Sequence, residues 1–188
     1  MKKALMIVSV LIVAVISTAC INNMAVQELN NKAAEYMQKG DYESAMNRLQ
    51  ASLDLDSTMY ETYYNLGVAA INAKKYDKAI EALENGIKIK ADFADFYYSL
   101  GLAQNDLADS ILDNEDDVNE SENNEKEIKQ KELSSEDKAK VEELKKQALD
   151  NLKKYYSMSS NAQEKETLES LIAEINSYFT DDSQKVAE

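Results

Sequence analysis

The stretch Tyr60–Phe93, YETYYNLGVAAINAKKYDKAIEALENGIKIKADF, decides the fold. It contains two short amphipathic helical patterns joined by a tight turn. The same pattern recurs at an offset of 34 residues on both sides. Upstream and downstream, the matching pairs are Tyr42/Tyr76, Ala45/Ala79, Leu49/Leu83, Leu53/Ile87, Tyr63/Tyr97, Tyr64/Tyr98, Leu66/Leu100 and Gly67/Gly101. A fixed period of this length predicts an array of helical hairpins in which each repeat packs on its neighbours.

The composition supports an all-helical chain and argues against several functions. Four Gly and no Pro among 188 residues leave few turn-forming positions, which favours helices over sheets. The formal net charge of −14 makes nucleic acid an unfavourable partner, because such a surface repels phosphate. The chain has no His, the commonest general base and metal ligand. We therefore expect neither an enzyme nor a cofactor, metal site or small-molecule substrate.

The repeat resembles the tetratricopeptide family, whose pattern is an aromatic residue, then Leu-Gly, then Ala and a large apolar residue, usually closing on Pro. Tyr63-x-x-Leu66-Gly67 and Ala79-x-x-x-Leu83 match it, and Ala91 stands where the Pro is usual. The resemblance implies an all-α fold of helical-hairpin repeats in a short right-handed superhelix. It covers Val26 to Phe179 apart from an insert.

The predicted repeats are 26–59, 60–93 and 94–158, and the third is split. Gly67 and Ala79 are 12 residues apart, whereas the equivalent Gly101 and Ala148 are 47 apart, so about 35 residues are inserted. The centre of the insert, at about 113–133, is acidic with few apolar residues, and we expect it to be disordered. Helix-start signals at Ser134 and Asn161 predict a longer third hairpin and then a capping helix at 161–179, followed by a polar tail at 180–188.

Residues 1–19 have the layout of a secretory signal peptide: a basic start, a 13-residue apolar run and small residues. That run spans about 20 Å as a helix, which is short for a membrane span. Thr18-Ala19-Cys20 is similar to the lipobox of bacterial lipoproteins, although Ser17 replaces the usual aliphatic residue. Cys20 is the only cysteine, and the resemblance implies that it carries the lipid, with 20–25 as a tether. Ordinary signal-peptidase cleavage after Ser17-x-Ala19 and an uncleaved anchor remain alternatives.

The tetratricopeptide resemblance also implies a binding surface. In that family the first helix of each pair lines a concave groove that holds an extended or helical segment of a partner. Carried onto this chain, the lining is Asn30, Ala34, Met37, Tyr64, Asn65, Val68, Ile71, Tyr98, Leu102 and Asn105. Spacings of four and three keep each set on one helical face. Packing of Tyr64 and Tyr98 between repeats is the alternative. The lysines and arginines of a carboxylate clamp are missing, because Asp95 and Ser99 stand in the third repeat.

These observations predict a lipid-anchored protein–protein interaction module, a scaffold or adaptor of the bacterial cell envelope facing the periplasm or exterior. Two alternatives remain. The chain could be a self-associating structural protein, or an acidic cation-binding envelope protein. For the latter, Asp113, Glu115, Asp117 and Asn119 alternate as in a calcium loop, but Val118 fills the position that requires Gly.

Overall fold

A computed structural model of the chain describes residues 23–113 and 133–185, and within these ranges it contains helices and turns but no strand. Residues 23–38 are helical. The helices that follow are α2 (Tyr42–Leu55), α3 (Tyr60–Asn72), α4 (Tyr76–Ile89), α5 (Asp95–Asp113), α6 (Ser135–Met158) and α7 (Ala162–Lys185). The predicted signal peptide, the lipidation site Cys20 and almost all of the predicted insert lie outside the described residues.

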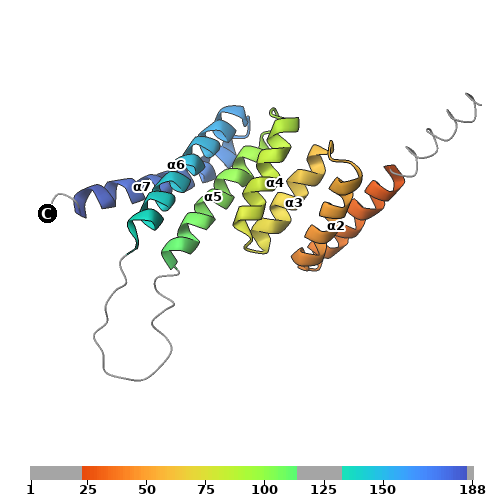
Figure 1. Cartoon of the computed structure of the whole chain (residues 1–188). Coiled ribbons are helices and arrows are strands. Elements are labelled where there is room, and N and C mark those ends of the chain that lie inside the picture. The colour runs from red at the N-terminus through yellow and green to blue at the C-terminus, as the bar shows by residue number, and fades with distance from the viewer. Residues whose placement is uncertain (1–22, 114–132, 186–188) are drawn as a thin grey trace, which may run out of the picture.

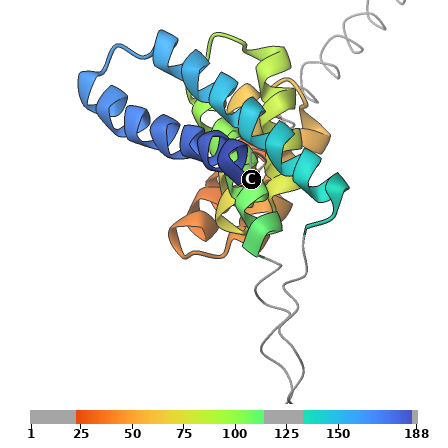
Figure 2. The same cartoon turned by 90° about the vertical axis from the view of Figure 1, so that its left-hand side faces the viewer.

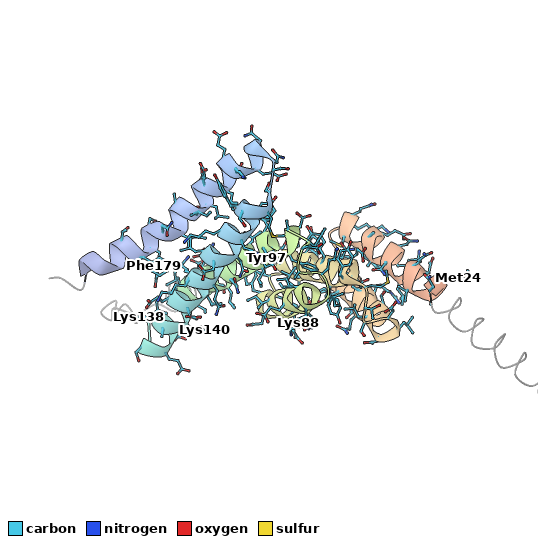
Figure 3. The ribbon with its side chains drawn as sticks, turned by 90° about the horizontal axis from the view of Figure 1, so that it is seen from above. Met24, Lys88, Tyr97, Lys138, Lys140 and Phe179 are labelled. Carbon is cyan, nitrogen blue, oxygen red and sulfur yellow. The ribbon has the colours of Figure 1, made fainter. Side chains whose placement is uncertain are left out.

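The helices stand side by side in chain order, so each packs mainly on the helix before it and the helix after it (Figure 1). Viewed from the C-terminal end, α6 and α7 lie in front of the other helices (Figure 2). Met24 lies near one end of the array and Phe179 near the other (Figure 3). This one-dimensional arrangement follows from the 34-residue period, because each hairpin repeats the same two apolar faces.

Within a hairpin, the two helices approach closely at a small residue. Gly67 of α3 faces Leu83 of α4, and Gly101 of α5 faces Leu152 of α6. Ala79 and Ala148 are both fully buried at equivalent places in α4 and α6. The α5–α6 hairpin therefore repeats the register of α3–α4 across the insert. Both glycine contacts lie inside a hairpin, rather than between neighbouring repeats.

Between hairpins, the closest approach involves Gly86 of α4 and Phe96 of α5. A Cβ at residue 86 would lie 2.2 Å from Phe96 Cζ, so only glycine leaves room for the ring. Phe96 is fully buried and joins a core cluster that extends from Ala33 to Ala103. The missing side chain at 86 thus allows the second and third hairpins to pack together.

The third hairpin is longer than the others, as the sequence predicted. Helix α5 has 19 residues and α6 has 24, compared with 13 and 14 for α3 and α4. Ser134 begins α6 as an N-cap, with its Oγ accepting a hydrogen bond from the Asp137 amide at 3.0 Å. Helix α7 packs on α6 through a cluster that includes the buried residues Leu168 and Ile175.

Both ends of the described helical region extend beyond the predicted limits. The first helix already includes residues 23–25, which the sequence assigned to a tether. Helix α7 continues to Lys185, into the predicted tail. Met24 is 72% exposed, so the buried apolar pattern begins only at Val26 although the helix has already started. Helices can continue through such exposed residues, and apolar periodicity does not detect them.

Candidate partner-binding surface

The candidate surface is formed by the first helix of each hairpin: residues 23–38, α3 and α5. We call it the first-helix face. Tyr98 of α5 is 37% exposed, which makes it the most open aromatic side chain on this face. Ala34 is exposed as well. The other predicted residues that remain partly accessible are Asn30, Met37, Tyr64, Asn65, Val68, Ile71 and Leu102.

Asn30 connects three helices. Its Nδ2 donates to the Ser52 Oγ of α2 at 2.9 Å, and its Oδ1 accepts from the Thr62 hydroxyl of α3 at 3.1 Å. Ser52 and Thr62 are both buried. Removing one member of this network would leave a buried polar group without its partner. Asn30 therefore holds the first hairpin to the second, with its amide already occupied.

Asn105 does not lie on an open surface, contrary to the prediction. It is 8% exposed, and its Oδ1 accepts a hydrogen bond from Lys145 Nζ of α6 at 3.1 Å. Lys145 is itself 5% exposed and pairs with Asp109 at 2.6 Å. Helical spacing groups Asn105 with the other predicted surface residues, but it does not show that a lysine of α6 bonds to this part of α5.

Tyr64 belongs to an aromatic cluster between two hairpins. Its ring centroid lies 5.3 Å from that of Phe93 and 5.9 Å from that of Phe96, in edge-to-face geometry. Tyr60 contacts the same two rings. Burial raises the pKa of the Tyr64 phenol. The packing alternative thus describes Tyr64 well, and only part of its ring remains available at the surface.

Tyr98 has a different neighbour. Its ring lies 5.3 Å from that of Tyr155, near the C-terminal end of α6, with 49° between the planes. The hydroxyl of Tyr155 donates to Glu164 Oε2 of α7 at 2.8 Å. Burial, followed by this hydrogen bond, raises the pKa of Tyr155 to about 12. Nothing in the local sequence around Tyr155 shows that its ring meets Tyr98, so sequence analysis missed this contact.

A carboxylate lies beside these rings. Asp95 is one helical turn before Tyr98 in α5, and its charge contributes to the raised pKa of both Tyr64 and Tyr155. Its equivalent one repeat earlier, Glu61 in the first turn of α3, is also exposed. The first-helix face therefore combines tyrosine rings with carboxylates at its α5 end.

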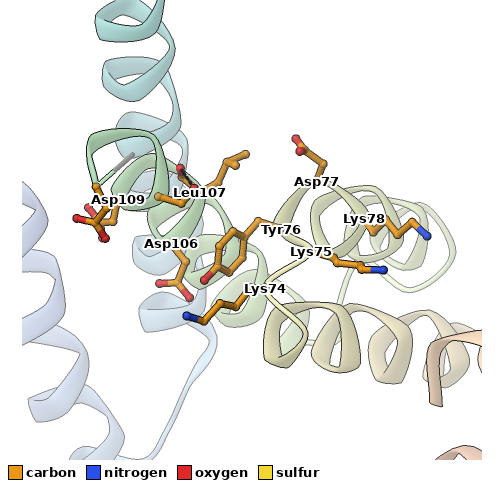
Figure 4. Close-up of a pocket in the computed structure, with 10 residues that line it drawn as sticks. Lys74, Lys75, Tyr76, Asp77, Lys78, Asp106, Leu107 and Asp109 are labelled. Atoms are coloured by element: carbon orange, nitrogen blue, oxygen red, sulfur yellow. Dashed lines mark hydrogen bonds between the residues drawn. The ribbon is translucent and has the colours of Figure 1, made fainter. Parts of the chain in front are cut away.

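A separate cleft of 730 Å³ lies where α5 extends past the turn between α3 and α4 (Figure 4). Lys74 extends toward Asp106 and Tyr76, whereas Lys75 and Lys78 point away from them (Figure 4). Burial, with the charge of nearby Asp109, raises the pKa of Asp106. Lysines and aspartates line the same cleft, so it carries side chains of both charges.

Among residues 23–113 and 133–185, no group of three acidic or cysteine side chains is placed to hold a metal ion. The calcium-loop pattern after Asp113 lies outside the described residues. None of the described helices is long and apolar enough to span a bilayer.

Residues 36–104 match the family model of the tetratricopeptide repeat. The chain has the tetratricopeptide-repeat fold. The match covers the first repeat from residue 36, the whole second repeat and the third repeat as far as residue 104, within α5.

Solved tetratricopeptide structures share this architecture at low sequence identity. The translocator chaperone SycD of Yersinia enterocolitica is 16% identical, with a TM-score of 0.58 over 82% of this chain and 86% of its own. The Arabidopsis OM64 tetratricopeptide domain is 12% identical, with a TM-score of 0.58 over 81% and 98%. The first tetratricopeptide domain of Spaghetti (RPAP3), bound to the HSP90 peptide SRMEEVD, is 14% identical, with a TM-score of 0.55 over 80% and 94%. No curated protein matches the sequence.

Proposed function

We propose that this chain is a non-enzymatic binding module that holds a segment of a protein partner against its first-helix face. The observation that carries the proposal is Tyr98, a large ring left 37% exposed on this face and backed by Tyr155 at 5.3 Å. A rigid aromatic side chain that is packed on one side and exposed on the other is typical of an interface anchor, because it loses little conformational entropy on binding.

Similar folds are known to hold peptides. SycD has been solved in complex with a peptide of the translocator YopD, and the RPAP3 domain with an HSP90 peptide. Both are under 25% identical to this chain, so they support the kind of partner and not its identity. The partner-binding region we propose is Met37, Tyr64, Asn65, Val68, Ile71, Tyr98 and Leu102, with Asn30 and Asn105 kept as structural residues.

We further propose that the module is displayed at a bacterial membrane through a lipid on Cys20. The support is the sequence of residues 1–20, with its basic start, apolar run and small residues before the sole cysteine. Two acyl chains would anchor the protein firmly, at about 0.8 kcal/mol per buried CH₂. The acidic body, with a net charge of −14 for the chain, would contribute no attraction to anionic headgroups.

Affinity capture tests the binding face. The tagged full chain, extracted from its own membranes in mild detergent, is used to recover its partner, which mass spectrometry identifies. Tyr98→Ala should then reduce the partner's affinity about 30-fold, the typical effect of truncating a central aromatic. Leu55→Ala is the matched control, because Leu55 is 44% exposed but belongs to the second helix of its hairpin. Equal capture by Tyr98→Ala and wild type would assign binding to another surface.

A further inference from the structure

The tyrosines near the α5 end of the first-helix face differ from four other tyrosines of the chain. Lysines of the protein lie over the rings of Tyr36, Tyr97, Tyr156 and Tyr178, at 4.6 to 6.0 Å from the centroids. Within the described residues, no lysine lies over Tyr64, Tyr98 or Tyr155. These three rings thus lack the cation that those four rings have.

The carboxylate beside these rings also lacks a cation. Asp95 forms no ion pair with any described residue, although it lies close enough to act electrostatically on Tyr64 and Tyr155. Glu164 provides a second negative charge, hydrogen-bonded to the Tyr155 hydroxyl at 2.8 Å. An unpaired carboxylate beside an open aromatic face attracts a cation through both its charge and the ring quadrupole.

We infer that the surface formed by Tyr98, Tyr155 and Asp95 binds an arginine side chain of the partner segment. This inference rests on the proposed function and specifies the chemistry of its partner. A guanidinium can stack flat on a tyrosine ring while it donates to a carboxylate, which a compact ammonium does less well. An acidic partner segment would be repelled by Asp95 and by the net charge of −14.

The test compares two fluorescent dodecapeptides of Ala and Leu, one with two arginines and the other with two citrullines. Citrulline has nearly the shape of arginine but no charge. Anisotropy titrations use the full chain in non-ionic detergent. We expect the arginine peptide to bind about tenfold more tightly, a difference of about 1.4 kcal/mol. Asp95→Asn should remove most of this preference and leave binding of the citrulline peptide unchanged.

Two further variants test whether the arginine preference depends on the charge at position 95 in particular and on the aromatic ring at position 98. Glu84→Gln, which removes an exposed charge on α4, should retain the arginine preference. Tyr98→Leu keeps apolar area but lacks a π-system, and it should reduce the preference at least threefold. Equal affinity for both peptides, equal effects of Asp95→Asn and Glu84→Gln, or no binding of the arginine peptide at about 1 mM would overturn the inference. Equal affinity that falls for both peptides in Tyr98→Ala would still leave the proposed binding face intact.

Discussion

Gly67 of α3 lies directly under Leu83 of α4, so close that a Cβ on residue 67 would be 2.5 Å from the leucine Cγ. Gly101 stands in the same relation to Leu152 at 2.8 Å, and there an added Cβ would also lie 3.0 Å from the backbone oxygen of Ala148. Leu83 and Leu152 are both fully buried. The same contact thus occurs twice, once before the insert in the sequence and once between residues on either side of it.

Gly101→Ala should destabilise the fold by about 1–3 kcal/mol, because the backbone oxygen of Ala148 cannot move aside as a side chain can. Gly67→Ala should cost less, since only the Leu83 side chain has to shift. Both changes also gain up to about 1 kcal/mol of helix propensity, which opposes the loss. Urea unfolding followed by circular dichroism measures the difference.

Ala33, in the place of Gly67 one repeat earlier, provides the control. It is buried, so Ala33→Gly should destabilise by about 0.5–1 kcal/mol through helix propensity. If Gly101→Ala proved as stable as wild type, the close contact in the third hairpin would be contradicted.

Gly40 and Lys74 occupy the same turn position in successive hairpins, and both are left-handed, with φ of 73° and 56°. A lysine pays a steric penalty in this region that glycine avoids. Lys74→Gly should therefore stabilise the fold by about 0.5–1 kcal/mol, and Gly40→Lys should destabilise it by a similar amount. Lys75→Gly is the control, because Lys75 has φ of −99° and gains nothing from glycine. Equal stability of Lys74→Gly and Lys75→Gly would refute this explanation.

Much of the fold was predictable, because the residues that recur with the repeat period are the ones buried between helices. The pairs Gly67/Gly101 and Ala79/Ala148 predicted the register, and the structure places both members of each pair at equivalent positions in their hairpins. Ser134 was a correct helix start, since its hydroxyl caps α6. Residue spacing was sufficient to predict the register, and one capping side chain was sufficient to predict the start of α6.

The surface was less predictable, because exposure depends on which helix covers which face. Asn105 and Tyr64 share helix faces with accessible residues, yet Lys145 bonds to the first and Phe93 and Phe96 pack against the second. These neighbours are all far in sequence from the residues they meet. The pairing of Tyr98 with Tyr155 was missed for the same reason.

The alkaline limit of stability should depend on Tyr155. Its folded pKa is raised to about 12 from 10.0, so folding favours the neutral phenol. Stability from this group is therefore complete below about pH 10 and is lost as the pH rises from 10 toward 12. In Tyr155→Phe the fall in unfolding free energy over this range should be shallower, as denaturant titrations at several pH values would measure. Tyr64 also has a raised pKa, so some slope should remain; identical slopes would contradict the assignment.

Cys20→Ser should release the protein from membranes or leave the leader uncut, because serine has no thiol to accept the lipid. Fractionation with mass spectrometry of the N-terminus checks both outcomes. Ser17→Ala is the control, since it keeps a small residue before the cysteine and should be processed normally. Normal processing and full membrane retention of Cys20→Ser would rule out this anchor.

The most direct measurement of the central claim, that the first-helix face holds the partner, is site-specific photo-crosslinking in living cells. Benzoylphenylalanine is placed at position 98 on α5 or at position 55 on α2, both of which carry exposed large side chains in the native protein. We predict that residue 98 crosslinks to the partner recovered by affinity capture, whereas residue 55 does not. Crosslinking from position 55 with none from position 98 would contradict the proposal and place the partner on the second helices.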